Sequence, residues 1–315
     1  MNEIQSLKSL STLDAIGKTP IVQLQKIVPK GCADILVKLE YFNPTGSYKD
    51  RMALAMIEEA EARGDLRPGM TVVEYTGGST GSSLAFICAV KGYNFKVVSS
   101  DAYAREKLQT MNAFGADLFI VPSEGGKITP DLVPRMIEKA KSLAESDDCY
   151  FMNQFHNSDS IVGYRKLGRE MLGQVEQHID AFCGGVGTAG MLMGVSQELR
   201  RANPEVRIVA LEPATTAVIS GGSAGSHHVE GLGVGFVPPL LDGELYDEAR
   251  GIDEREARLM ARRLAKEEGI FAGTSSGLNV VGALQLAEEH GEGKTVVTVA
   301  VDTGLKYLAD DLYAA

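Results

Sequence analysis

The 315-residue sequence contains no tryptophan, only four cysteines and no long apolar run. Because Cys32, Cys88, Cys149 and Cys183 are scattered without CxxC spacing, a zinc site or a disulfide framework is not expected, and buried free thiols are. No apolar segment approaches the ~20 residues that a membrane span needs. The acid-containing N-terminus also lacks the pattern of a signal peptide. We therefore expect a cytoplasmic protein without a membrane partner.

The sequence also lacks an excess of basic charge. Its 31 Lys and Arg residues against 42 Asp and Glu residues give a formal net charge of -11. This balance argues against a nucleic-acid partner or an anionic membrane surface, since both require a basic patch. A small anionic ligand remains compatible with it, because a few local backbone N–H groups outweigh a distant net charge.

What the sequence does contain is an alternation of short β-branched runs with helical patterns. This alternation predicts an α/β fold with mainly parallel sheets. Strands are predicted at residues 33–40, 71–75, 95–100, 117–121, 180–185, 206–212 and 294–301. Helices are predicted at residues 49–64, 79–92, 105–115, 132–146 and 188–202. Residues 220–247 form the longest irregular stretch, and loops of such length are often functional.

Three glycine-rich turns follow strands or precede helices: residues 76–81 (TGGSTG), 184–190 (GGVGTAG) and 272–277 (AGTSSG). In α/β folds, ligands bind at the carboxyl ends of strands, where loops meet helix N-termini. Three loops of small residues that converge there predict a crevice for a flat, anionic ligand that the backbone approaches closely.

The second turn also fits a dinucleotide fingerprint. Gly185, Gly187 and Gly190 have the G-x-G-x-x-G spacing after a strand, and Glu212 ends the next strand, so a nicotinamide-dependent oxidoreductase is an alternative interpretation. Two features argue against it: the element lies past the middle of the chain, and Pro213 directly follows Glu212. In either case, glycines at a helix N-terminus predict a phosphate site.

Residues 43–51 (NPTGSYKDR) place Lys49 between a strand and a helix. This segment resembles the NPxGSxKDR signature of fold type II enzymes, which have the tryptophan-synthase-β fold and depend on pyridoxal phosphate (PLP). Within that group the sequence is most similar in arrangement to the family of cysteine synthase (O-acetylserine sulfhydrylase) and cystathionine β-synthase. The resemblance continues in order through seven further segments, at residues 16–24, 74–85, 154–157, 184–194, 230–238, 272–277 and 302–308.

The resemblance implies a role for each matching residue. Lys49 is the Schiff-base lysine and the acid/base at Cα, and Ser275 faces the pyridine nitrogen, with Ser276 a less favoured partner. The other implied cofactor contacts are Ser79, Gly187, Thr188, Ala189, Gly190 and Met191. The implied substrate-binding residues are Thr76, Gly77, Gly78, Ser79, Thr80, Gln154 and Gly231, with residues 231–235 forming a facing wall. Thr80 and Thr76 supply hydroxyls for the α-carboxylate.

Three positions depart from the family pattern. Met191 stands where threonine is usual, so one hydroxyl contact to the cofactor phosphate is lost. Ser79 replaces an asparagine that contacts the cofactor ring oxygen, and Gly77 replaces a serine that helps hold the carboxylate. We expect the cofactor to bind nevertheless, because oriented main-chain N–H groups hold most of a phosphate.

The resemblance further implies two lobes, each a mainly parallel sheet flanked by helices. Residues 46–150 are expected to form a smaller mobile lobe, and residues 1–45 with 151–315 a larger one. The implied reaction is β-replacement on a small L-amino acid of the O-acetylserine or serine type, with sulfide or a thiol as nucleophile, in a homodimer. Alternatives are β-elimination (cysteine desulfhydrase or serine/threonine dehydratase), cystathionine synthesis and a non-catalytic paralogue. Neither a haem-binding extension nor a regulatory domain is expected.

His227 and His228 form the one histidine pair. Since no carboxylate or cysteine stands at ligand spacing, we expect solvated loop histidines and no metal site.

Overall fold

The strands form two separate sheets in a computed structural model that describes residues 11–126, 129, 131–309 and 311–314. The six-stranded sheet has the order β1-β2-β10-β7-β8-β9. Only β1 is antiparallel in it, and the other neighbours pair in parallel. The four-stranded sheet has the order β5-β4-β3-β6 and is parallel throughout.

The bounds of the ten strands are β1 Ile21–Gln23, β2 Asp34–Leu39, β3 Thr71–Tyr75, β4 Asn94–Ser100, β5 Asp117–Val121, β6 Cys149–Phe151, β7 Ala181–Gly185, β8 Arg207–Pro213, β9 Glu248–Ile252 and β10 Thr295–Ala300. The bounds of the eight α-helices are α1 Lys49–Arg63, α2 Ser79–Lys91, α3 Arg105–Ala113, α4 Leu132–Leu143, α5 Asp159–Gln174, α6 Gly190–Ala202, α7 Glu254–Arg263 and α8 Thr274–His290.

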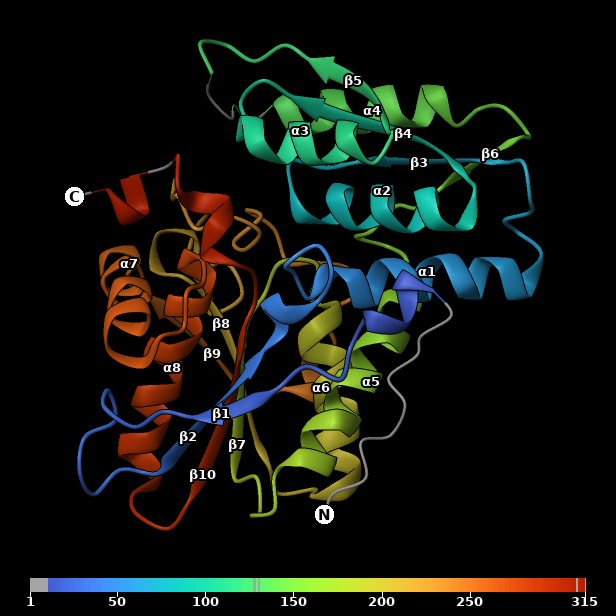
Figure 1. The fold of residues 1–315 in the computed structure, drawn as a ribbon. Coiled ribbons are helices and arrows are strands. Elements are labelled where there is room, and N and C mark those ends of the chain that lie inside the picture. Colours follow the sequence, from blue (N-terminus) through green and yellow to red (C-terminus); the bar gives the residue numbers. More distant parts are fainter. Residues whose placement is uncertain (1–10, 127–128, 130, 310, 315) are drawn as a thin grey trace.

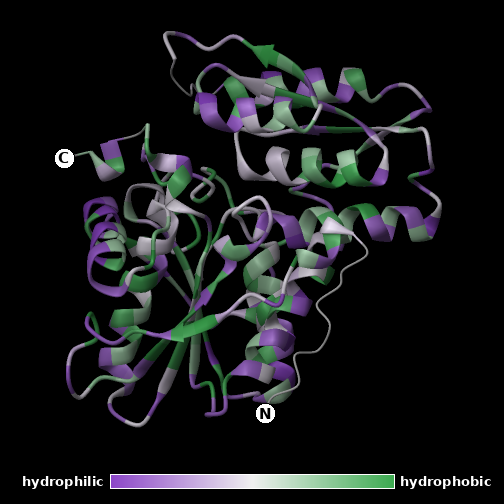
Figure 2. Ribbon diagram, viewed as in Figure 1, coloured by the Kyte–Doolittle hydropathy of each residue, from purple (hydrophilic) through white to green (hydrophobic). Residues whose placement is uncertain are grey.

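Helices cover both faces of each sheet (Figure 1). Successive residues of a strand point to opposite faces, so each strand contributes to two cores. In β3, Val72 joins the core under α2 and α3, whereas Val73 joins the core under α4. In β7, Phe182 packs toward α5 and α6, and Cys183 packs toward α7 and α8. The strands are therefore apolar on both faces, as the green strands of Figure 2 show.

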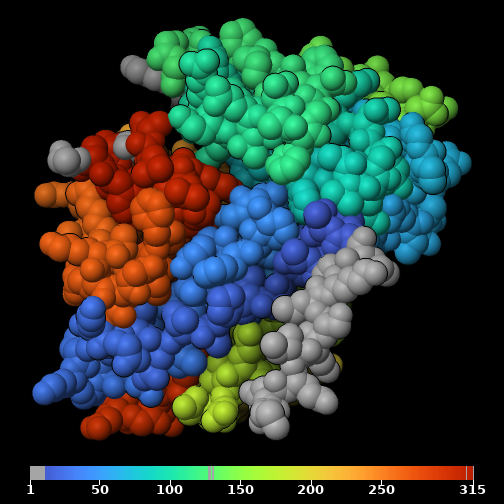
Figure 3. Space-filling model, viewed as in Figure 1, coloured from blue at the N-terminus to red at the C-terminus, as the bar shows by residue number. Residues whose placement is uncertain are grey.

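Helix α1 lies between the two sheets (Figure 1). Its buried residues Met52, Met56 and Ile57 belong to a core that also contains Leu84 of α2 and Leu167 of α5. One continuous core thus joins the layers above and below α1. The space-filling view shows the two halves of the molecule in contact along their shared boundary (Figure 3).

The predicted α/β architecture is confirmed, and each of the seven predicted strands and five predicted helices is present. The sequence analysis did not predict β1, β6 and β9, nor helices α5 and α7, and it gave no bounds for α8, which follows the predicted turn at residues 272–277. β1 and β6 have three residues each, which is too short for a recognisable period. The expected division at residues 46–150 remains a prediction, although β3 to β6 fall almost entirely within it.

The expectation of buried free thiols needs correction for two of the four cysteines. All four are free, as expected, but only Cys88 and Cys183 are buried, whereas Cys32 and Cys149 are partly exposed. Both lie at sheet margins: Cys149 opens the edge strand β6, and Cys32 precedes β2. Among the described residues, no helix has the length and apolarity to cross a membrane.

A buried ion network fixes the start of α1. Arg51 donates from Nε to Glu40 Oε2 at 2.6 Å and from Nη1 to Glu170 Oε1 at 2.8 Å. Lys38 also donates to Glu170, over 2.9 Å. The Arg51 and Glu40 side chains are 3% and 0% exposed. This network joins β2, α1 and α5, three elements that are distant in sequence.

We predict that Arg51→Ala lowers the free energy of unfolding by about 3–5 kcal/mol, because Glu40 would remain as an unpaired buried carboxylate. Chemical denaturation followed by circular dichroism measures this change. Arg63→Ala is the matched control: Arg63 pairs with Asp159, but its side chain is 45% exposed, so a loss of about 0–1 kcal/mol is expected. Equal losses in both variants would contradict the prediction.

Candidate active site

Lys49 is the first residue of α1, and its side chain is buried, with 8% of the residue exposed. The preceding turn is held by Asp50, whose carboxylate accepts from Thr45 N at 2.8 Å and from Thr45 Oγ1 at 2.6 Å. Tyr48 N donates to Val301 O at 3.0 Å and so ties this turn to the end of β10. The sequence thus presents the lysine on a rigid helix start.

The Lys49 amine lies among weakly polar groups. Its Nζ is 3.7 Å from Met52 Sδ and 5.0 Å from the centre of the Tyr48 ring. Burial lowers the pKa of Lys49 to about 8, and the negative charge of Glu74 opposes this shift. A larger fraction of neutral amine is therefore present near neutral pH than in an ordinary lysine.

Glu74, at the end of β3, organises the neighbouring turn. Its carboxylate accepts from Gln154 N at 3.0 Å and from Tyr75 N at 2.8 Å. Gln154 Nε2 in turn donates to Tyr75 O at 3.2 Å. Glu74 is fully buried, and burial raises its pKa to about 8 against these hydrogen bonds and the charge of Lys49. The sequence analysis assigned no role to Glu74, although it opens a matching segment.

The predicted substrate loop, residues 76–81, joins β3 to α2. Thr80 Oγ1 donates to Gln154 Oε1 at 2.8 Å, so two predicted substrate-binding residues contact each other directly. A β-carbon at Gly77 would lie 2.2 Å from the ring of Tyr103, which explains why no side chain fits at this position. Ser79 Oγ accepts from Lys306 Nζ at 3.1 Å. Tyr103 and Lys306 were not predicted.

The predicted phosphate loop joins β7 to α6. Ala189 has a φ of 69°, a left-handed conformation in which successive main-chain N–H groups form an anion-binding concavity. The first bond within α6 runs from Met193 N to Ala189 O at 3.0 Å, so the N–H groups of Gly190 and Met191 have no partner within the helix. A β-carbon at Gly187 would lie 2.1 Å from Gly231 O. The loop and the predicted facing wall therefore touch.

These features fit an aldehyde cofactor that carries a phosphate. The start of α6 offers unpaired N–H groups to an anion, and glycine at position 187 lets the backbone approach closely. Ser276 Oγ accepts from Val301 N at 2.8 Å, whereas Ser275 is 3% exposed and makes no side-chain hydrogen bond to the described residues. Ser275 is thus the serine that is available to a ligand.

An ion pair bridges the two sheets beside this site. Lys107 of α3 is 5% exposed and pairs with Glu230, which precedes Gly231. Its Nζ also lies 5.2 Å from the centre of the Tyr307 ring. No motif marks Lys107 or Glu230 as partners, because they are far apart in sequence: Lys107 lies in α3, beside the four-stranded sheet, and Glu230 lies in a loop of the half that holds the six-stranded sheet.

The structure also shows the surroundings of Glu212 and of the histidine pair. Glu212 is 1% exposed and accepts from Ile219 N and Ser220 N, so it is not available as a ribose-binding acid. His228 is exposed, as expected. His227 is not simply solvated, since its Nε2 lies 2.9 Å from Gly233 O. No group of metal-binding side chains is present among the described residues.

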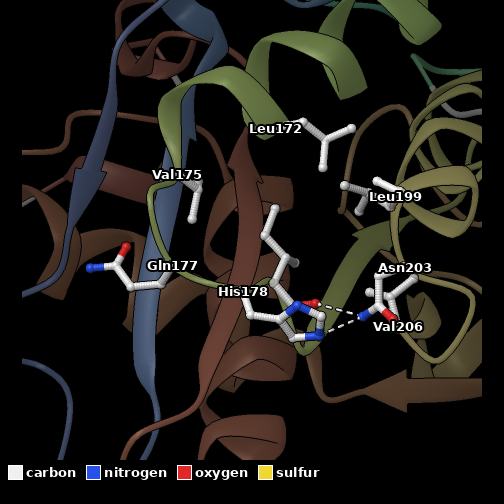
Figure 4. A pocket seen from close by; sticks show the side chains of 9 residues that line it. Leu172, Val175, Gln177, His178, Leu199, Asn203 and Val206 are labelled. Atoms are coloured by element: carbon white, nitrogen blue, oxygen red, sulfur yellow. Dashed lines mark hydrogen bonds between the residues drawn. The ribbon is translucent and has the colours of Figure 1, made fainter.

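One pocket lies at the opposite, amino end of β7 (Figure 4). It is lined by Leu172 of α5, by Leu199 and Ala202 of α6 and by residues of the segments that follow these two helices, and the His178 ring contacts Asn203 Nδ2 over 2.8 Å. Because ligands of α/β folds bind at the carboxyl ends of the strands, this pocket is not the candidate site.

The chain is similar to known proteins along almost its whole length. The family profile described as "pyridoxal-phosphate dependent enzyme" matches residues 12–302. A cysteine synthase from Staphylococcus aureus is 45% identical over 95% of each chain. An O-ureido-L-serine synthase from Streptomyces lavendulae is 42% identical over 96% of this chain and 92% of its own. The crystal structure of a cysteine synthase from Entamoeba histolytica superposes with a TM-score of 0.91 at 34% identity, over 100% of this chain and 94% of that one.

We predict that Lys49 of the cofactor-free protein forms an imine with pyridoxal at a rate that rises with pH and levels off above about 8, because only the neutral amine attacks and its pKa is lowered to about 8. An ordinary exposed lysine would level off only above about 10.4. Stopped-flow absorbance measures the rate, and Lys49→Ala is the control that removes it. A rate that still climbs beyond pH 10 would contradict the low pKa.

Proposed function

Since this chain belongs to the family of pyridoxal-phosphate dependent enzymes, we propose that it catalyses β-replacement on a small L-amino acid of the serine or O-acetylserine type, with sulfide or a thiol as nucleophile. PLP is its cofactor, and a small molecule is its substrate. Two of its relatives are a cysteine synthase and an O-ureido-L-serine synthase, which supports this choice of reaction.

Lys49 is the proposed catalytic residue. The bound cofactor withdraws electrons from the amino acid that it holds, and the protein supplies acid/base chemistry at Cα. The neutral Lys49 amine would hold the aldehyde carbon of the cofactor as an imine, with loss of water, and after the substrate's amino group has displaced it the freed amine would accept the α-proton. The single observation that carries the proposal is this buried amine, with a pKa of about 8, on the first turn of α1.

The proposed carboxylate site is the loop of residues 76–81 together with Gln154. Thr76 and Thr80 would offer hydroxyls, and Gly77 and Ser79 would offer main-chain N–H groups near the start of α2, whereas Gly78 N donates to Thr76 Oγ1 at 3.2 Å and holds the turn. The hydrogen bond between Thr80 and Gln154 supports a joint role. Gly231 would form the opposite wall of the site, where the absence of a side chain admits the amino acid.

The remaining assignments concern the cofactor and the assembly. We propose that residues 187–191 hold the phosphate, that Ser79 faces the ring oxygen, and that Ser275 faces the ring nitrogen, where a neutral hydroxyl favours β-elimination and replacement over transamination. We further propose a smaller lobe of residues 46–150 that closes on the substrate and excludes water. A cytoplasmic homodimer is the expected form of the protein.

The reaction is tested by incubating the pure holoenzyme with O-acetylserine, serine, cysteine or phosphoserine, each with and without sulfide. We expect cysteine to form from O-acetylserine only when sulfide is present, as measured by chromatography. Lys49→Ala should abolish product formation and the visible absorbance of the cofactor together. Release of pyruvate without any replacement product would indicate elimination instead. No product from any of the four amino acids would contradict the proposed function.

A second prediction concerns Glu74. Glu74→Ala should raise KM for the amino acid about tenfold, because the main-chain N–H of Gln154 loses its buried acceptor. Steady-state kinetics measures the change, and kcat should fall less than kcat/KM. Glu74→Gln keeps one acceptor oxygen and should lie between Glu74→Ala and the unchanged protein. A fall in kcat at constant KM would contradict the role of Glu74 in positioning Gln154.

A further inference from the structure

Ser160, in the first turn of α5, has a buried hydroxyl without a partner. The residue is 0% exposed, and its Oγ makes no hydrogen bond in the described part of the chain. A buried hydroxyl that lacks a hydrogen bond costs free energy, so such groups usually have a partner, a water molecule or a functional role. The position of the Ser160 hydroxyl indicates what this partner is.

The Ser160 hydroxyl points at the start of α6. A β-carbon at Gly190, the first residue of this 13-residue helix, would lie 2.9 Å from Ser160 Oγ. Helices α5 and α6 pack closely along their length (Figure 1). Because Gly190 has no side chain, the Ser160 hydroxyl can lie next to the N–H groups at the N-terminus of α6. Helix N-termini of this kind bind anions.

Met191 stands at the same helix start, where the family pattern has a threonine, and it has no hydroxyl. Its side chain is 4% exposed and runs into the core, since its Cε would lie 2.5 Å from a β-carbon at Gly184 of β7. Met191 therefore offers no polar atom to an anion at the start of α6. The phosphate loop has lost a hydroxyl at this position, and a hydroxyl from another helix lies beside the same helix end.

We propose that Ser160 donates a hydrogen bond to the phosphate of the bound cofactor and takes the place of the hydroxyl that Met191 lacks. The inference rests on the phosphate loop proposed above and is independent of which amino acid reacts. It also accounts for the unpaired hydroxyl. A phosphate oxygen would accept the hydrogen bond that Ser160 Oγ does not make to any described residue.

The test compares two ligands that differ only in the phosphate. In Ser160→Ala, the dissociation constant for PLP should rise about tenfold, as expected for one hydrogen bond to a charged group. The dissociation constant for pyridoxal, which has no phosphate, should not change. Absorbance titration of the cofactor-free protein measures both constants. The thermal midpoint of that protein should stay the same or rise, because the variant removes an unpaired buried hydroxyl.

Two variants complete the design. Met191→Thr in the Ser160→Ala background should restore PLP affinity, since it returns a hydroxyl to the loop. Ser99→Ala is the matched control: Ser99 Oγ is also buried and unpaired, but it lies on β4 in the other sheet, so neither constant should change. Equal weakening of both ligands in Ser160→Ala, or of neither, would overturn the inference. Failure of the unchanged protein to bind PLP would instead refute the proposed function.

Discussion

The position of the Lys49 amine depends on the Arg51 ion network two residues further along α1. Arg51 bonds to Glu40, which follows β2, and to Glu170 of α5, so one guanidinium fixes the helix start against both neighbours. Burying these charges is favourable only when all of them are paired. The same layer of packing that holds the network also excludes water from Lys49, and this burial lowers the pKa of its amine. Burial of this layer therefore underlies both the stability of the α1 start and the lowered pKa of the Lys49 amine.

The second determinant of the site is the meeting of two sheets at their carboxyl ends. The hydrogen bond between Ser79 and Lys306 and the ion pair between Lys107 and Glu230 each join a residue beside the four-stranded sheet to a residue beside the six-stranded sheet. In the proposed site, a cofactor and an amino acid would contact residues from both halves of the molecule at once. Small loop residues are needed at the closest approaches, as the contact of Gly187 with Gly231 illustrates.

Each residue that departs from the family pattern has a neighbour from another part of the chain that fits the change. Gly77 carries no side chain because the Tyr103 ring fills the space, and Ser79 accepts from Lys306. Met191 turns into the core, and the Ser160 hydroxyl lies 2.9 Å from the place of a β-carbon at Gly190, beside that helix start. In each case, a change in a local motif is matched by a residue outside that motif. These pairs distinguish this site from one built strictly on the family pattern.

The sequence by itself determined the α/β architecture, the family and its cofactor, and the position of Lys49 at a helix start, because periodicity and ordered motifs are local. Short strands such as β1 carry too little pattern to be recognised. Only the tertiary structure decided that Glu74 holds Gln154, that Glu212 is buried and that Ser160 faces the start of α6. Such contacts join residues far apart in the chain, and their burial and direction arise only when the helices and sheets pack together.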